Sequence, residues 1–308
     1  MAPSLDIRFD GRVAVVTGAG RGLGRAYALL LASRGAAVVV NDIGVQPRGD
    51  DPDASVAEGV VKEIVDLGGR AVASTDSVAT PEGGAAIVQA ALDAFGQVDL
   101  LVHNAGVVTA CTFADQSLAE VRTVLDVHLL GAWHVGQPAW RDMAARGYGR
   151  IVLTTSMAQF GHQTQPAYAA AKTGIIGLVK SMAHEAEAAG LDIRVNAIAP
   201  LAGTRLARDD ARALYQELME PENVAGVVGL LLSDECPCNG QIVHAGGSHV
   251  ALGVLGHTQG WAKRSTPVTP EDVRQHLGEI TDLTDLALPP NANEQMALVE
   301  RIVTGRTK

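Results

Sequence analysis

A tyrosine and a lysine about one helical turn apart could together take up a proton from a substrate. Tyr168 and Lys172 stand four residues apart in an expected helix, so their side chains leave the same face. A phenol that acts as a base near pH 8 needs its pKa lowered by about two units from a reference near 10, or about 2.7 kcal/mol. One cation at about 5 Å supplies roughly 3 kcal/mol at an effective dielectric constant of about 20. Lys172 together with an oxidised nicotinamide could therefore lower the pKa of the phenol enough for it to remove the proton of an alcohol.

A serine extends this pair to a set of three groups. Ser156 lies 12 residues before Tyr168, just after an expected strand, where its hydroxyl can reach the same substrate oxygen as the phenol. Thr155 is a competing hydroxyl, and either residue could be an ordinary turn residue. A Tyr and a Lys at this spacing also occur on solvated helix faces. Together, Ser156, Tyr168 and Lys172 favour a catalytic group.

A glycine-rich turn at residues 17–24 lies between an expected strand and an expected helix. Glycine lets backbone amides approach a pyrophosphate, and the amino end of the helix adds partial positive charge. The spacing is a variant of the usual dinucleotide motif, which needs glycine where Leu23 stands. The order of strand, turn and helix still favours a dinucleotide site. The residues assigned to that site from this turn are Gly18, Arg21, Gly22, Leu23 and Gly24.

An acidic residue just past the second expected strand bears on the choice of dinucleotide. Asp42 lies 18 residues after Gly24, where a carboxylate can bind both hydroxyls of an adenosine ribose and repel a 2′-phosphate. NAD is therefore favoured as the cofactor. Arg21 argues for NADP, since a basic side chain in the turn could pair with that phosphate. Asp42 could also be a turn-forming acid.

Short apolar runs alternate with amphipathic segments along the chain, and these are the elements that must position the site. This pattern predicts parallel strands covered by helices on both faces and joined by right-handed crossovers. We expect an α/β fold: a doubly wound parallel seven-stranded sheet (Rossmann fold) with a C-terminal helical extension. The strands are expected at 13–17, 38–41, 71–74, 100–103, 150–154, 193–198 and 241–244. The helices are expected at 22–33, 55–67, 81–95, 118–143 and 166–189.

Residues 1–308 are interpreted as a single domain, with a core over 8–250 and an extension over 251–308. No change of composition marks a linker within the core, and no segment of 20 to 50 residues repeats. In the extension, the segment 269–272 has the cap, first-turn proline and acidic residue of a helix that runs to about Ile280. We expect the extension to cover part of the substrate pocket or an oligomer interface.

The composition indicates a folded, acidic protein. Hydrophobic residues make up 47% of the chain and charged residues 19%, which excludes a disordered chain. The formal net charge of −10 argues against a nucleic acid partner. No apolar run approaches the roughly 20 residues of a membrane span, and the charged amino terminus argues against an export signal. Three cysteines without the spacing of a zinc site indicate a cytoplasmic protein without a metal centre.

Taken together, these motifs resemble the short-chain dehydrogenase/reductase family. Within that family, the chain is similar to the dehydrogenase part of the peroxisomal multifunctional-enzyme branch, and the likeness covers nearly the whole chain. The family's motifs occur here in its order and spacing at 17–24, 104–106, 156, 168, 172, 196 and 200.

The resemblance implies an NAD-dependent enzyme that oxidises (3R)-hydroxyacyl-CoA to 3-ketoacyl-CoA in fatty-acid or steroid side-chain β-oxidation. Tyr168 would take the hydroxyl proton and Ser156 would bind the substrate oxygen. Lys172 would lower the pKa of the phenol and hold the nicotinamide ribose. Two further positions match family contacts near the adenine and its ribose, and a third matches one near the carboxamide: Asp76, Asn104 and Thr204.

His128 departs from the wider family, which has an asparagine there to hold a water that relays the proton. The multifunctional-enzyme branch is similar to this chain in having histidine. An imidazole can relay protons, and a hydrogen-bonded helical histidine is the alternative. The resemblance also implies a homodimer or homotetramer and a small-molecule substrate, acyl-CoA or steroid. Two other functions stay open: a hydroxysteroid or other secondary-alcohol dehydrogenase, and a catalytically silent nucleotide-binding protein.

Overall fold

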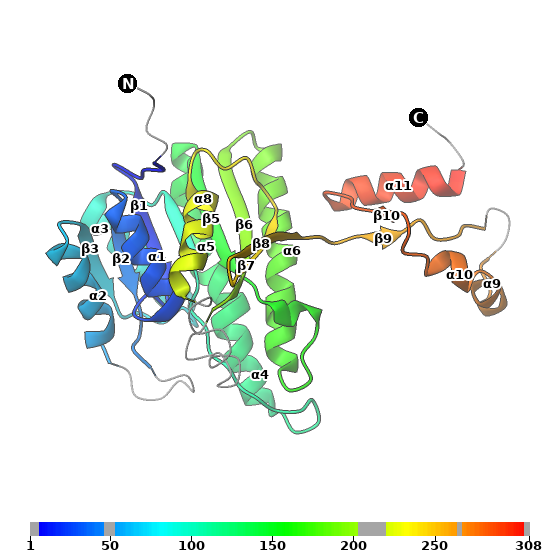
Figure 1. Ribbon diagram of the computed structural model, residues 1–308, viewed down its shortest axis with the longest axis horizontal. Coiled ribbons are helices and arrows are strands. Elements are labelled where there is room, and N and C mark those ends of the chain that lie inside the picture. Colours follow the sequence, from blue (N-terminus) through cyan, green and yellow to red (C-terminus); the bar gives the residue numbers. More distant parts are fainter. Residues whose placement is uncertain (1–5, 46–52, 203–219, 264–266, 305–308) are drawn as a thin grey trace. The chain divides into compact units, whose positions relative to one another are not determined.

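The computed structural model describes residues 6–45, 53–202, 220–263 and 267–304. Within them, eight strands form the central sheet: β1 Val13–Thr17, β2 Ala37–Asn41, β3 Arg70–Ser74, β4 Leu100–His103, β5 Tyr148–Thr154, β6 Asp192–Leu201, β7 Ile242–Gly246 and β8 His249–Gly253. Their order across the sheet is β3-β2-β1-β4-β5-β6-β7-β8 (Figure 1). All neighbours from β3 to β7 run parallel.

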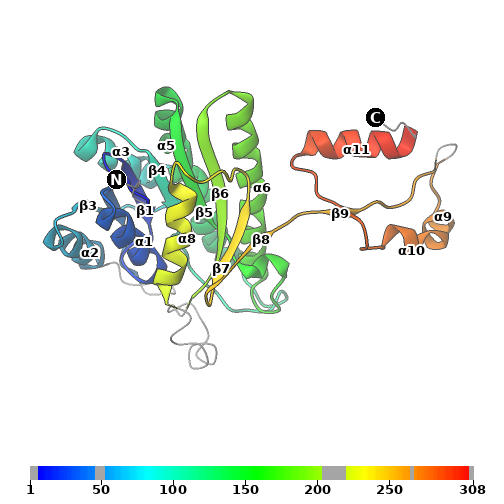
Figure 2. The ribbon, with the colours of Figure 1, turned by 45° about the horizontal axis from the view of Figure 1, so that its top comes forward.

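Helices cover both faces of this sheet. They are α1 Gly22–Ser33, α2 Ser55–Asp66, α3 Pro81–Phe95, α4 Leu118–Leu125, α5 Gly131–Arg146, α6 Pro166–Ala188 and α8 Pro221–Leu232, with a π-helix η1 at Asp126–Leu130 and a 3₁₀ helix η2 at Met157–Phe160. The apolar sides of α1, α2 and α8 pack on one face, and those of α3, α5 and α6 on the other (Figures 1 and 2). The expected doubly wound α/β fold is confirmed.

Two elements of this fold are missing from the sequence-based expectation. The prediction of seven strands was wrong, because β8 adds an eighth beside β7. Its exposed Val250 and Leu252 lie at the sheet edge, and glycines flank the strand, so it lacks the buried apolar run of the other strands. Helix α8 was also not predicted. Its sequence is apolar on almost all sides and shows little helical periodicity.

The long helix expected over 118–143 is three elements in the structure. After α4, the π-helix η1 widens the backbone for five residues before α5 begins at Gly131. A π segment accommodates an extra residue in a helical run, and such segments occur often at functional sites. The predicted site residue His128 lies within η1.

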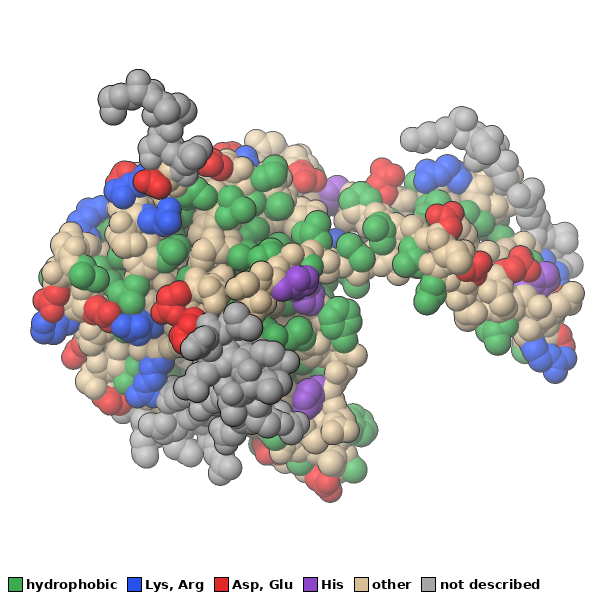
Figure 3. Space-filling model, in the orientation of Figure 1, with side chains coloured by type: hydrophobic (Ala, Val, Ile, Leu, Met, Phe, Trp, Pro, Cys, Tyr) green, Lys and Arg blue, Asp and Glu red, His purple; other side chains and the backbone are tan. Residues whose placement is uncertain are grey.

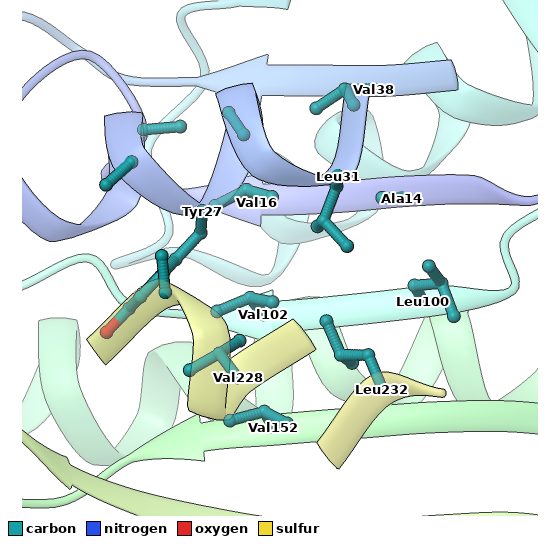
Figure 4. Packing of buried hydrophobic residues seen from close by; sticks show 14 of the residues in the cluster. Ala14, Val16, Tyr27, Leu31, Val38, Leu100, Val102, Val152, Val228 and Leu232 are labelled. Atoms are coloured by element: carbon teal, nitrogen blue, oxygen red, sulfur yellow. The ribbon is translucent and has the colours of Figure 1, made fainter. Parts of the chain in front are cut away.

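Apolar side chains between the sheet and the helices hold the strands in place. In Figure 4, Tyr27 and Leu31 of α1 lie with Val228 and Leu232 of α8 on the same side of the sheet. All four are fully or almost fully buried. The hydroxyl of Tyr27 has no hydrogen-bond partner among the described residues, so this tyrosine serves in packing. The packed core gives the carboxyl ends of β1 and β4 fixed positions.

The order in which successive strands are added to the sheet reverses between β1 and β4. β1 pairs with β2 on one side and with β4 on the other. In open α/β sheets, ligands bind in the crevice at the carboxyl ends of the strands at such a point. The last residues of the two strands, Thr17 and His103, contact each other there, with 3.2 Å between Oγ1 and Nδ1. The fold therefore predicts the ligand site at this end of β1 and β4.

The chain divides into two compact units, Met1–Leu252 and Gly253–Lys308. In the second unit, Thr269 and Asp272 form the expected capping box, but the expected helix is divided into two short ones. None of the helices of this unit buries a residue. Its elements are the antiparallel strands β9 His257–Thr258 and β10 Leu286–Ala287 and the helices α9 Pro270–Gln275, α10 Leu277–Ile280 and α11 Ala292–Thr304.

The surface in Figure 3 carries acidic and basic side chains interspersed with apolar ones, without a continuous basic area among its described residues. In the described ranges, no helix combines the length and the apolar character that a bilayer crossing requires.

Candidate active site

The glycine-rich turn between β1 and α1 is packed too closely for side chains at two positions. A Cβ added to Gly24 would lie 2.1 Å from the carbonyl oxygen of Gly18. A Cβ added to Gly18, whose φ is +63°, would lie 2.8 Å from Cα of Ala105 on the segment after β4. Arg21 precedes α1 and its side chain does not cap the helix, so first-turn amides keep their capacity for an anion. This turn fits the pyrophosphate of a dinucleotide.

Asp42 lies against this turn. Its carboxylate accepts hydrogen bonds from the amides of Gly20, at 2.9 Å, and Gly44, at 2.7 Å. Both oxygens are thus oriented by the backbone beside the glycine turn. Arg21 is near Asp53: the hydrogen bonds from Ser55 lower the pKa of the Asp53 carboxyl most, and the Arg21 charge adds to this.

The other predicted dinucleotide residues lie at the ends of β3 and β4. Asn104 uses its side-chain amide nitrogen to donate to the carbonyls of Thr17, at 3.2 Å, and Gly18, at 3.1 Å. It therefore connects the glycine turn to β4. Asp76 follows β3 and accepts a 3.0 Å hydrogen bond from the Ser74 hydroxyl. Thr204 lies outside the described residues.

A cavity of about 220 Å³ lies at the carboxyl ends of the strands and brings the catalytic candidates together. Tyr168 and Lys172 project from the first turns of α6, with the lysine Nζ 5.6 Å from the centre of the phenol ring. Lys172 Nζ also donates to the Thr154 carbonyl at 2.5 Å. The cavity is lined by Leu23, Asn104, Gly106, Val108, His128, Thr154, Thr155, Ser156, Met157, Gln165, Tyr168, Lys172, Pro200, Leu201 and Ala202.

The two hydroxyls after β5 have different partners. Thr155 is fully buried and donates to the Lys172 carbonyl at 2.6 Å, which ties β5 to α6. Ser156 caps the short helix η2, accepts from the Ala158 amide at 3.2 Å, and is near enough to Tyr168 to oppose the rise in the pKa of its phenol. Ser156 is therefore the hydroxyl that shares the phenol's environment, and Thr155 has a structural role.

Burial dominates the electrostatics of this cluster. It raises the pKa of Tyr168, and hydrogen bonding by Ser156 opposes the rise. Burial also lowers the pKa of Lys172 to about 7. Burial therefore outweighs the lysine charge for these two groups, and the lowering of the phenol pKa by Lys172 together with an oxidised nicotinamide stays a prediction.

The pKa of Lys172 predicts how stability depends on pH. The unfolded chain keeps the lysine proton to about pH 10, and the folded chain loses it near 7, so the unfolded state binds more protons between these values. Stability from this group therefore rises with pH in that window. We expect the unfolding free energy of the wild type, relative to Lys172→Met, to increase by about 2 kcal/mol from pH 7 to pH 9. Urea titrations at both pH values measure this; parallel curves would contradict it.

His128 lies edge-on to Tyr168, with ring centres 5.0 Å apart and an interplanar angle of 87°. Its Nε2 is 2.7 Å from the carbonyl oxygen and 3.1 Å from the amide of Val107, and its Nδ1 has no partner among the described residues. Burial holds the pKa of the imidazole well below its ordinary value. His128 is therefore a neutral ring against the phenol, and its relay role stays a prediction.

Several cavity residues were not singled out from the sequence as site residues. Gln165 is among them, as are the apolar Val108 and Leu201. None of them belongs to a sequence motif. Each lines the cavity because of how a loop or a strand end is folded. The sequence indicated only that Gln165 directly precedes the proline that begins α6.

A closely packed glycine turn and a Ser–Tyr–Lys cluster, side by side at the switch point of a parallel sheet, define an oxidoreductase that acts on CH–OH groups. The chain belongs to the short-chain dehydrogenase family, whose model it matches over residues 12–211. It is 44% identical over 274 residues to a protein named as a short-chain type dehydrogenase/reductase in Mycobacterium tuberculosis, covering 89% of this chain and 95% of that protein.

Two longer proteins confirm the resemblance to the multifunctional-enzyme branch. The chain is 40% identical to peroxisomal multifunctional enzyme type 2 of Mus musculus over 94% of its own length and 39% of that protein. The solved structure of full-length peroxisomal multifunctional enzyme type 2 from Drosophila melanogaster is similar, with a TM-score of 0.80 at 33% identity. That match covers 97% of this chain and 50% of the other.

Proposed function

We propose that this protein oxidises (3R)-hydroxyacyl-CoA thioesters to 3-ketoacyl-CoA with NAD. The observation that carries the proposal is the convergence of Ser156, Tyr168 and Lys172 on one cavity beside the glycine turn. The similarity to multifunctional enzymes over 94% of the chain supports the substrate class. Peroxisomal hydratase-dehydrogenase-epimerases of two fungi, 36% and 38% identical to this chain, support it as well.

The reaction needs one group to hold the alcohol oxygen and one to accept its proton. Ser156 donates a hydrogen bond to that oxygen, and the Tyr168 oxygen, next to it, accepts the proton. Lys172 supplies positive charge near the phenol ring whenever it is protonated, which favours the phenolate. A bound nicotinamide dinucleotide supplies the acceptor for the hydride.

The choice of NAD rests on Asp42. Its carboxylate is fixed beside the glycine turn, where it suits the two ribose hydroxyls of NAD and disfavours the extra phosphate of NADP. Lys172 would hold the nicotinamide ribose, and the amides of the turn would hold the pyrophosphate. We place the enzyme in the cytoplasm as a homodimer or homotetramer that serves lipid breakdown.

The stereochemistry of the substrate tests this proposal. We expect NADH to form with (3R)-hydroxyacyl-CoA and at least about 100-fold more slowly with the (3S) isomer, because a mirror-image carbon cannot present both its oxygen to Tyr168 and its hydrogen to the same dinucleotide face. The absorbance of NADH at fixed enzyme concentration measures both rates, with NADP in a parallel series. Turnover of free steroid alcohols but of neither thioester would instead indicate a hydroxysteroid dehydrogenase.

A further inference from the structure

Almost every polar side chain on the cavity wall already has a partner in the protein. Asn104 commits its amide nitrogen to two backbone carbonyls of the glycine turn. Thr155 donates to the carbonyl of Lys172, and His128 is held by Val107. The Thr154 hydroxyl and Nδ1 of His128 have no partner among the described residues, but both atoms are buried. The amide nitrogen of Asn104, the Thr155 hydroxyl and Nε2 of His128 therefore have little hydrogen-bonding capacity left for a substrate.

Gln165 is different. Its side chain lines the same cavity, and within the part of the chain that the structure describes it makes no hydrogen bond. It directly precedes α6 but its side chain does not cap the helix, and the nearby amide of Ala167 donates its hydrogen bond to Oε1 of Gln116 at 3.3 Å. A primary amide contributes two donors and an acceptor. The cavity thus contains one uncommitted amide, three residues before Tyr168.

From this arrangement we infer that Gln165 selects substrates with a carbonyl two carbons from the alcohol, by donating a hydrogen bond from Nε2 to that carbonyl. The inference rests on the proposed function. Ser156 and Tyr168 are occupied with the reacting oxygen, so a second oxygen of the substrate needs another donor. Unlike the buried Thr154 hydroxyl, Gln165 is partly exposed and its side-chain amide has free donors among the described residues.

The remaining wall makes this donor selective. Val108, Met157 and Leu201 contribute apolar surface to the same cavity. A carbonyl placed against them without a donor loses the hydrogen bonds that it makes in water. A 3-hydroxyacyl thioester has a carbonyl that Gln165 can satisfy, whereas a simple secondary alcohol makes no use of this amide. The amide therefore raises the specificity for β-hydroxy thioesters above that for plain alcohols.

The test compares two substrates in each of four proteins. The substrates are (3R)-hydroxybutyryl-CoA and (R)-2-pentanol, which has the same kind of carbinol without the carbonyl. The proteins are the wild type, Gln165→Leu, Gln165→Glu and the matched control Gln163→Leu, whose exposed glutamine lies two residues earlier and does not line the cavity. The measured quantity is the ratio of kcat/KM for the thioester to kcat/KM for the alcohol.

We expect this ratio to fall about tenfold in Gln165→Leu, because the lost hydrogen bond affects the thioester alone. It also falls in Gln165→Glu, since a carboxylate cannot donate to the carbonyl, and it stays within twofold of wild type in Gln163→Leu. Retained alcohol oxidation shows that each variant is folded.

An unchanged ratio in both Gln165 variants, or an equal loss on both substrates, overturns the role of Gln165 and leaves the proposed function standing. Alcohol oxidation by the wild type without any thioester oxidation overturns both.

Discussion

Replacement of Tyr168 by Phe is expected to lower kcat for alcohol oxidation by about a thousandfold or more. The variant removes one oxygen atom from a ring that packs against His128 and Lys172, so the cavity keeps its shape. Without the phenol, the neighbouring groups are poorer proton acceptors: Ser156 is not a base, burial holds the pKa of His128 well below its ordinary value, and Lys172 directs Nζ to the Thr154 carbonyl. General base catalysis contributes about 10² to 10⁴ in rate. The initial rate of NADH formation under saturating substrate measures the effect.

The control for this variant is another tyrosine outside the cavity. Tyr148 lies at the start of β5, where its hydroxyl donates to Asp234 at 2.8 Å. Tyr148→Phe should keep its rate within a few-fold of wild type. Dinucleotide binding, measured by the quenching of protein fluorescence, should be unchanged in Tyr168→Phe. A Tyr168→Phe protein that binds the dinucleotide and retains its rate would show that the chemistry uses another group.

The second large effect is expected from the carboxylate beside the glycine turn. Asp42→Asn should reduce the preference for NAD over NADP, expressed as a ratio of kcat/KM, by about 100-fold. A unit charge about 6 Å from a 2′-phosphate contributes roughly 2.8 kcal/mol at an effective dielectric constant of about 20. The amide oxygen of Asn can still accept one of the two hydrogen bonds from Gly20 and Gly44, so the turn is retained. Arg21 then faces the phosphate without the competing charge.

Asp66→Asn on the exposed side of α2 is the matched control, because it removes the same charge from a residue paired only with Lys62. Its cofactor ratio should equal that of the wild type. Steady-state kinetics with both dinucleotides, at an ionic strength that screens distant charges, give the comparison. An unchanged ratio in Asp42→Asn would mean that Asp42 is a turn-forming acid and does not discriminate between the cofactors.

Elements with local end signals could be predicted from the sequence to the residue. Helix α3 spans Pro81–Phe95 as expected, because Thr80 caps it, Pro81 fits its first turn, and Gly96 ends it with a φ of 83°. Elements without such signals could not. β8 is recognisable only from its pairing with β7, and η1 arises from packing that overrides local helix geometry.

In the candidate site too, some features could be predicted from the sequence and others could not. Tyr168 and Lys172 converge because their spacing is a property of any helix, and Ser156 joins them because the ends of parallel strands meet at one edge. The effect of burial on the pKa values of Tyr168 and Lys172 was not predicted, since sequence shows which charges are near but not how much water they lose. Gln165 lines the cavity because of the path of one loop, and residue spacing in the sequence does not predict that path.

The π-helix η1 makes the direction of a side chain in this protein depend on the length of the chain. An α-helix advances about 100° per residue, so the loss of one residue from Asp126–Leu130 would make α4 and α5 a continuous regular helix and rotate one against the other by that angle. His128 would then leave the edge of the Tyr168 ring, although neither residue had mutated. A single-codon deletion here would therefore act on the reaction centre like a substitution within it.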